Sequence, residues 1–134
     1  MGTDFEELPE KTGDKFEKFV DLVAYLRSEE GCKWDRQQTM ESMKPHLLEE
    51  AEEVIEAIEK KNMEEICEEL GDLLLHVVFF SRMAEEDNLF DIDRVLENIH
   101  EKIVRRHPHV FDDLHLETTE EILDNWKKIK QNET

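Results

Sequence analysis

One stretch, LLEEAEEVIEAIEKKNMEEICEELGDLLLHVVFF at positions 47 to 80, sets strong limits on the fold. Its apolar residues recur every three or four positions, the spacing that places side chains on one face of an α-helix. In the middle, Asn62 is followed three residues later by Glu65, a pattern that resembles a helical capping box. The stretch therefore predicts two consecutive helices, the first from roughly Pro45 to Lys60 and the second from Asn62 to about Glu86.

The same spacing continues along the chain, which has only four glycines and three prolines. A turn from Thr39 is an alternative start for the helix at Pro45, and GCKWDRQQT and HPHVFDDLHLE are expected to be a loop and a linker. Further helices are expected from about Asp14, as N-cap, to Glu29, from Ile92 to Arg106, and from a cap at Thr118 to Gln131. An all-α bundle of about five helices follows, in a single domain over residues 1–134 with a core at about 14–131.

Charge excludes two classes of partner. Lysine and arginine total 17 against 36 aspartates and glutamates, and the resulting net charge of -19 repels nucleic-acid backbones and anionic membranes. No stretch reaches the roughly 18 uninterrupted apolar residues of a membrane span, and the N-terminal MGTDFEELPEK resembles no export signal. Cys32 and Cys67 are far apart in the sequence, which argues against a disulfide framework or a zinc site. We expect a cytoplasmic protein without membrane or nucleic-acid partners.

Acidic residues gather where the two central helices are expected to pack. Successive helical residues are about 100° apart, so Glu50 lies at the edge of its helix's apolar stripe and Glu53 about 60° further round. Glu69 and Asp72 share one strip of the next helix. A solvated acidic face is the simpler interpretation of the first pair, but the apolar run from Leu73 to Phe80 leaves little of the second helix to face water. Acids at its margin call for a cation. The apolar stripe of the first helix, expected to face the core, comprises Leu47, Leu48, Ala51, Val54, Ile55 and Ile58.

Two carboxylate pairs on packed helices suit a hard divalent cation. Mg²⁺ takes oxygen ligands and usually keeps waters and substrate phosphates among them. Four carboxylates carry more negative charge than one divalent ion neutralises, so two or more ions bridged by a polyphosphate are expected. The pattern predicts a magnesium site for a phosphorylated ligand.

Several short motifs stand in order along the chain. Glu49–Glu53 has the pattern E-E-x-x-E and Glu69–Asp72 the pattern E-x-x-D, and around them lie GCKWDRQQT, RMAEEDNLFD, KIVRRHPHVF and WKKIK. Together these resemble the signature of the MazG family of nucleoside triphosphate pyrophosphohydrolases, in the all-α NTP pyrophosphatase superfamily, with its G-C-P-W-D-x-x-Q-T and K-x-x-R-R-H-P-H-V-F segments. E-x-x-D alone is too common to identify a family, but the ordered set, over about residues 16 to 130, is specific.

The resemblance implies a four-helix core, completed by dimerisation, that hydrolyses a nucleoside triphosphate to the monophosphate and diphosphate and removes non-standard or excess nucleotides. It implies Glu50, Glu53, Glu69 and Asp72 as ligands of two or more Mg²⁺ ions, with Mn²⁺ as an alternative ion. These metals would polarise phosphate oxygens and lower the pKa of the water that attacks phosphorus. Glu49 is the candidate for orienting or deprotonating this water, although a merely solvated side chain explains it equally well.

Four more residues are candidates for holding the nucleotide. Lys102 and Arg106, one helical turn apart, are expected to bind phosphate, and complementing a helix C-terminus is the structural alternative. Trp34 either stacks on a base or plugs the end of the bundle, with the plug preferred. His76 either contacts the nucleotide or is a hydrogen-bonded core residue, with the core preferred.

Departures from the family pattern leave rival functions open. Lys33 stands where the family usually has proline, and long members carry two such domains whereas this chain has one. A catalytically weak or inactive MazG-like domain, serving in nucleotide binding or oligomerisation, is the main alternative. A di-iron oxidoreductase is another, but it needs E-x-x-H on two helices, and here only Glu97 to His100 fits.

The apolar run from Leu73 to Phe80 also predicts assembly. Short amphipathic neighbours cannot fully cover a helix that is apolar on nearly every side, and a second copy is the simplest cover. We expect a homodimer or a higher homo-oligomer.

Overall fold

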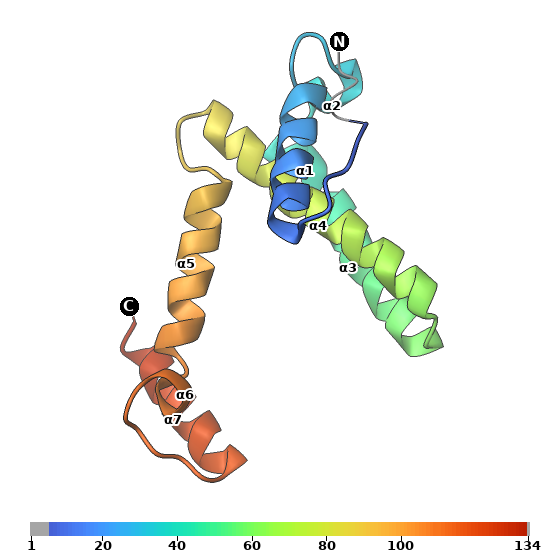
Figure 1. Ribbon diagram of the computed structural model, residues 1–134. Helices are drawn as coiled ribbons and strands as arrows, with labels where there is room; N and C mark the ends of the chain where they lie inside the picture. The colour runs from blue at the N-terminus through green and yellow to red at the C-terminus, as the bar shows by residue number, and fades with distance from the viewer. Residues whose placement is uncertain (1–5, 134) are drawn as a thin grey trace. The chain divides into compact units, whose positions relative to one another are not determined.

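The computed structural model describes residues 6–133 and shows helices joined by turns within that range (Figure 1). The expected all-α fold is confirmed, with more helices than the sequence predicted. None of the helices described is both long enough and apolar enough to cross a membrane. In chain order they are α1 (Thr12–Leu26), α2 (Lys33–Gln37), α3 (Met40–Lys60), α4 (Met63–Glu86), α5 (Ile92–Arg105), α6 (Pro108–Phe111) and α7 (Thr119–Gln131).

Two short helices occupy segments expected to be irregular. α2 lies within GCKWDRQQT and α6 within HPHVFDDLHLE, so the predictions of a loop and a linker are wrong there. α2 has five residues and α6 four, too few to show the apolar repeat that identifies a longer helix. Pro108 opens α6, a position where its fixed φ and missing N–H are tolerated.

Helix α1 begins and ends earlier than predicted. Asp14 is not the N-cap but lies in the first turn, where its negative charge interacts favourably with the helix dipole. The helix ends at Leu26 because the chain folds back at Gly31, where any Cβ would clash with the carbonyl oxygen of Tyr25. The N–H of Cys32 closes this turn by donating to the carbonyl oxygen of Leu26 at 2.8 Å.

Helix α3 uses the alternative start. The Thr39 hydroxyl accepts from the N–H of Ser42 at 3.1 Å, and the Ser42 hydroxyl accepts from the N–H of Thr39 at 2.9 Å. This reciprocal cap fixes the start of the helix, so Pro45 lies inside α3 rather than in its first turn. Asn62 and Thr118 cap α4 and α7 as predicted.

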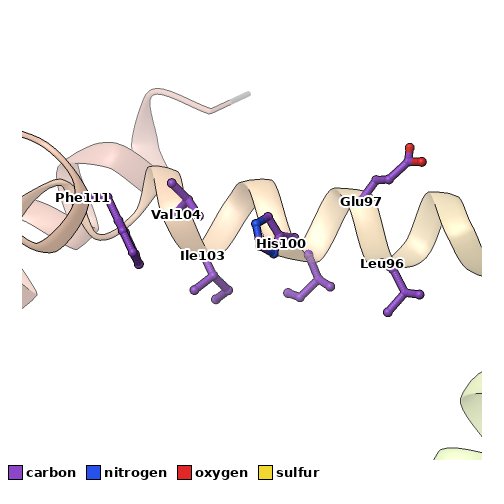
Figure 2. Close-up of a pocket in the computed structure, with 7 residues that line it drawn as sticks. Leu96, Glu97, His100, Ile103, Val104 and Phe111 are labelled. Carbon is purple, nitrogen blue, oxygen red and sulfur yellow. The ribbon is translucent and has the colours of Figure 1, made fainter. Parts of the chain in front are cut away.

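The chain forms two compact units, residues 1–92 and 93–134. In the second unit, α5 leaves its apolar stripe exposed. Figure 2 shows Leu96 and Ile103 projecting from one side of α5 and Glu97 from the other. With Phe111, the stripe lines an open cavity of about 780 Å³. His100, the other half of the E-x-x-H motif, also lines this cavity. The prediction of a single domain stays a prediction.

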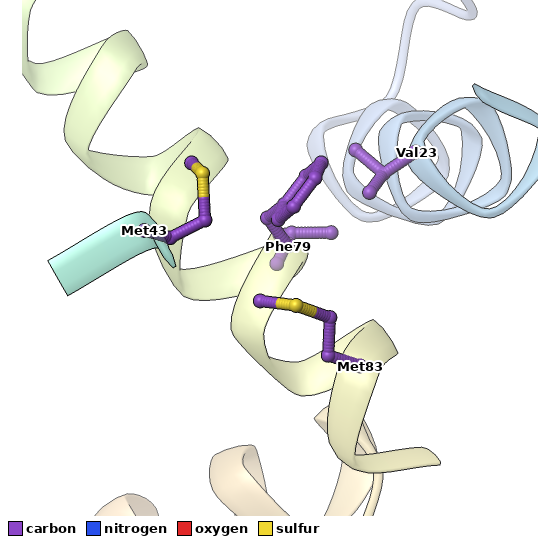
Figure 3. Packing of buried hydrophobic residues seen from close by; sticks show 5 residues of the cluster. Val23, Met43, Phe79 and Met83 are labelled. Atoms are coloured by element: carbon purple, nitrogen blue, oxygen red, sulfur yellow. The ribbon is translucent and has the colours of Figure 1, made fainter. Parts of the chain in front are cut away.

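In the first unit, α1 packs against the pair formed by α3 and α4. Val23 of α1, Met43 of α3, and Phe79 and Met83 of α4 are buried together with Val78, and Figure 3 shows the ring of Phe79 between Val23 and Met43. An apolar stripe of α1 packs against this core. The stripe residues partly buried there are Phe16, Phe19 and Val20.

Helices α3 and α4 form an antiparallel hairpin, and both leave apolar side chains exposed in the single chain. The expectation that the whole stripe of α3 faces the core is wrong, as is the expectation that little of α4 beyond Asp72 faces water. Among the described residues of this unit, α1 is the one other long helix, and it covers a single side of the hairpin. The exposed hairpin residues are Leu48 (64%), Ile55 (55%) and Ile58 (55%) on α3, and Met63 (69%), Leu70 (51%), Leu74 (41%) and Val77 (41%) on α4.

Candidate metal centre

Carboxylates of α3 and α4 converge inside the hairpin. Glu50, Glu69 and Asp72 each offer an oxygen, and these oxygens lie within 4.8 Å of one another. The helices are joined by a tight turn at Lys61, whose φ of 57° is left-handed. Glu50 precedes this turn by as many residues as Asp72 follows it, so the antiparallel hairpin brings the two to the same level. We call Glu50, Glu69 and Asp72 the acidic cluster.

The acidic cluster is partly withdrawn from water. Glu50 is only 8% exposed. One carboxylate oxygen of Glu50 and one of Glu69 are buried without a hydrogen-bond partner. Burial raises the pKa of the Glu50 carboxyl, and the charge of Asp72 adds to this rise. The hydrogen bond with Glu50 raises the pKa of Glu69. Because these surroundings penalise negative charge, a bound cation would stabilise the ionised cluster.

The two other predicted acids lie beside the acidic cluster. A hydrogen bond with Glu69 raises the pKa of Glu53. Glu49 is exposed, and its charge adds to the raised pKa of both Glu50 and Glu53. The structure thus gathers all five acids in one region of the hairpin, while their individual roles stay predictions.

His76 is buried on α4, one turn beyond Asp72, with 8% of its surface exposed. Its Nδ1 lies 2.9 Å from the backbone carbonyl oxygen of Asp72, and because a carbonyl can only accept, Nδ1 carries a proton. The other ring nitrogen, Nε2, is buried without a partner. The preferred prediction of a hydrogen-bonded core histidine is confirmed at Nδ1, and a nucleotide contact stays a prediction.

Trp34 lies on α2 and is 52% exposed, so the prediction of a buried plug is wrong. Its ring meets that of His46 edge-on, with centroids 6.2 Å apart. A folded-back α2 holds Trp34 at the surface, and this short helix could not be inferred from the apolar pattern. Base stacking by Trp34 stays a prediction.

Arg27, which was not predicted to have a role, fixes α2 in place. Its guanidinium donates to the carbonyl oxygens of Asp35 at 2.6 Å and Gln38 at 3.2 Å. It also pairs with Glu86 of α4 at 2.8 Å and lies over the Phe79 ring, 5.2 Å from the centroid. A buried arginine is rare, and nothing in the helical spacing distinguishes Arg27 from a solvated one.

Lys102 and Arg106, the predicted phosphate ligands, belong to the second unit. Lys102 is half-buried on α5. The guanidinium of Arg106 pairs with Glu133 at 2.7 Å and lies over the Trp126 ring, 5.3 Å from its centroid. Their role in phosphate binding stays a prediction.

Metal binding at the acidic cluster is expected to be linked to proton release. The raised pKa values mean that the folded protein binds protons more tightly than the unfolded chain, whose carboxyls titrate near 4.5. The metal-free protein should therefore lose stability as pH rises from about 4.5 through the raised values, and Mg²⁺ should reverse this loss. Thermal melting with EDTA and with Mg²⁺, from pH 4.5 to 7.5, checks this.

The many acidic residues of the chain repel one another more strongly as pH rises, and this also lowers stability. The Glu69→Gln variant is therefore the control that isolates the effect of the acidic cluster. Removing Glu69 should flatten the pH dependence of the metal-free melting temperature and remove the stabilisation by Mg²⁺. Identical curves for the variant and the wild-type protein would contradict the linkage.

Comparison with known families agrees with the geometry. Residues 38–111, which contain α3, α4 and α5, match the family described as the MazG nucleotide pyrophosphohydrolase domain. A crystal structure of a mazG-related protein from Thermotoga maritima superimposes with a TM-score of 0.71 and 28% identity, covering 87% of this chain and 99% of that one.

Two curated proteins are similar over most of this chain. The nucleoside triphosphate pyrophosphohydrolase/pyrophosphatase MazG of Thermotoga maritima is 52% identical over 77% of this chain and 40% of its own length. The nucleoside triphosphate pyrophosphohydrolase of Escherichia coli (strain K12) is 40% identical over 90% of this chain and 46% of its own length. This chain thus spans less than half the length of these two relatives.

Proposed function

The chain belongs to the MazG nucleotide pyrophosphohydrolase family, and we propose that it hydrolyses nucleoside triphosphates to monophosphates and diphosphate with Mg²⁺. The observation that carries this proposal is the convergence of Glu50, Glu69 and Asp72 in the hairpin. Their donor set is all oxygen, which suits Mg²⁺ or Mn²⁺ rather than a softer metal. The unpartnered buried oxygens of Glu50 and Glu69 support a cation there.

Glu50, Glu53, Glu69 and Asp72 would hold two or more Mg²⁺ ions. When bound, these ions would supply positive charge to the phosphate oxygens and lower the pKa of water. All four carboxylates stand on the long helices α3 and α4, so their spacing is set by regular backbone rather than by a loop. Glu49, exposed next to Glu50, is proposed to orient the attacking water or to take its proton.

Lys102 and Arg106 are proposed to bind the triphosphate. Lys102→Ala is expected to raise KM for the triphosphate roughly tenfold with little change in kcat, because a charge-assisted contact to phosphate is lost. Steady-state kinetics at saturating Mg²⁺ measure this. Lys128→Ala removes an equivalent charge from an exposed position on α7 and is the matched control. An unchanged KM for Lys102→Ala would indicate that the charge of Lys102 complements the C-terminal end of its helix instead of binding phosphate.

A panel of ordinary and modified triphosphates, incubated with Mg²⁺ and analysed for products, tests the proposed reaction. Monophosphate and diphosphate in equal amounts support it, with the preferred bases and sugars indicating which nucleotides are cleared. Nucleotide binding without products would favour the alternative of a non-catalytic binding module. Release of inorganic phosphate alone would contradict cleavage between the α and β phosphates.

We further propose that a second copy of the chain covers the exposed hairpin residues in a homodimer. Seven large apolar side chains on two adjacent helices are costly to leave in water. A two-fold axis would let the same residues of each copy cover one another. A cytoplasmic location and the absence of nucleic-acid partners stay predictions from composition.

A further inference from the structure

Two neighbouring arginines of the second unit hold one carboxylate. Glu133 accepts from Nε of Arg106 at 3.2 Å and from Nη2 of Arg106 at 2.7 Å. It also accepts from Nε of Arg105 at 2.7 Å. The side chains of Glu133 and Arg106 are 16% and 14% exposed, and Trp126 backs the Arg106 guanidinium at 5.3 Å. This is a formed oxyanion site, occupied by an anion of the same chain.

Guanidinium groups bind carboxylate and phosphate oxygens in the same forked geometry. Glu133 brings two oxygens and one negative charge to the site, whereas a diphosphate or triphosphate group brings more of both. The two arginines, Arg106 foremost, lower the pKa of Glu133 to about 2. The carboxylate is therefore ionised at every pH of ordinary assays, and it occupies the arginines whenever no other anion does.

Glu133 can leave the site without disturbing α7. It follows Asn132, the C-cap of that helix, and its own N–H reaches the carbonyl oxygen of Lys130 at 3.4 Å, near the limit of a hydrogen bond. Rotating its side chain away breaks no hydrogen bond within α7.

We propose that Glu133 is an internal competitor for the oxyanion site of Arg105 and Arg106, and that the phosphate groups of the nucleotide displace it. This rests on the proposed function, in which Arg106 binds the triphosphate. It adds Arg105 to the phosphate site and gives the chain a built-in control over its affinity for anions.

Titration of inorganic diphosphate into the full chain, followed by calorimetry with EDTA present, tests the competition. Glu133→Gln is expected to bind diphosphate roughly fivefold more tightly than the wild-type protein, because one competing charge is removed. Glu101→Gln is the matched control: Glu101 also pairs with Arg105, at 2.9 Å, but from an exposed position, and the same change should leave diphosphate binding unaltered. Adding Arg106→Ala to Glu133→Gln should abolish the gain.

Equal or weaker diphosphate binding by Glu133→Gln, with its fold verified by circular dichroism, would overturn the proposal and make Glu133 a support for the arginines. A gain that persists in the double variant would overturn it as well. If Glu133→Gln does not fold, Glu133→Ala replaces it in the diphosphate titration. Since no Mg²⁺ or turnover is involved, a protein that fails to hydrolyse triphosphates would still give a clear result here.

Discussion

Replacing Glu69 with glutamine is expected to lower kcat/KM for Mg²⁺-dependent hydrolysis roughly a thousandfold. Glu69 hydrogen-bonds to both Glu50 and Glu53, so it stands at the centre of the proposed ligand set. Glutamine keeps the shape of the side chain and removes the charge that a cation requires. Release of diphosphate from a triphosphate at saturating Mg²⁺ measures the effect.

Glu56→Gln is the matched control for this variant, because Glu56 is exposed on α3 and the change in charge is the same. Its turnover should stay within about twofold of the wild-type value. Glu69→Gln should also melt at a higher temperature than the wild-type protein without metal, since it relieves repulsion among like charges. Undiminished turnover in Glu69→Gln would remove Glu69 from the metal site.

The second large effect is expected at the hairpin. Leu74→Asp should convert a dimer into monomers and weaken association by roughly a thousandfold or more. In a two-fold symmetric dimer each copy would bury one new aspartate charge in the interface. Leu74 is 41% exposed in the single chain, so a monomer can solvate the aspartate and keep its fold. Sedimentation or light scattering at micromolar concentration gives the mass, and circular dichroism verifies the fold.

Leu123→Asp is the control for Leu74→Asp. Leu123 lies on α7 in the second unit, is 50% exposed and is not one of the exposed hairpin residues, so its replacement should leave the mass unchanged. A monomeric mass for the wild-type protein would contradict the proposed dimer. A dimer that survives Leu74→Asp would place the interface elsewhere.

The long helices could be predicted from the sequence because each repeats its apolar spacing over several turns. The same spacing placed Glu50 at the edge of its helix's apolar stripe and put Glu69 and Asp72 on one strip of the next helix, and the structure brings these three together. The short helices α2 and α6 contain about one turn each, which is too little for a period to appear.

The exposure of the apolar side chains was predicted less well than the positions of the long helices. Leu48 and Val77 look like core residues by spacing, but spacing cannot tell a face covered by the same chain from one that the chain leaves open. Contacts between residues distant in sequence could not be predicted either. Arg27 pairs with Glu86, and Arg106 with Glu133, through the packing of separate helices, and neither pair follows a local pattern.

The central claim is that acidic residues of α3 and α4 bind a divalent cation together. A crystal structure of the protein with Mn²⁺, using the anomalous signal of the metal, tests it most directly. We expect a peak roughly 2.0–2.3 Å from carboxylate oxygens of Glu50, Glu69 and Asp72. A peak elsewhere, or none at the acidic cluster, would contradict the claim.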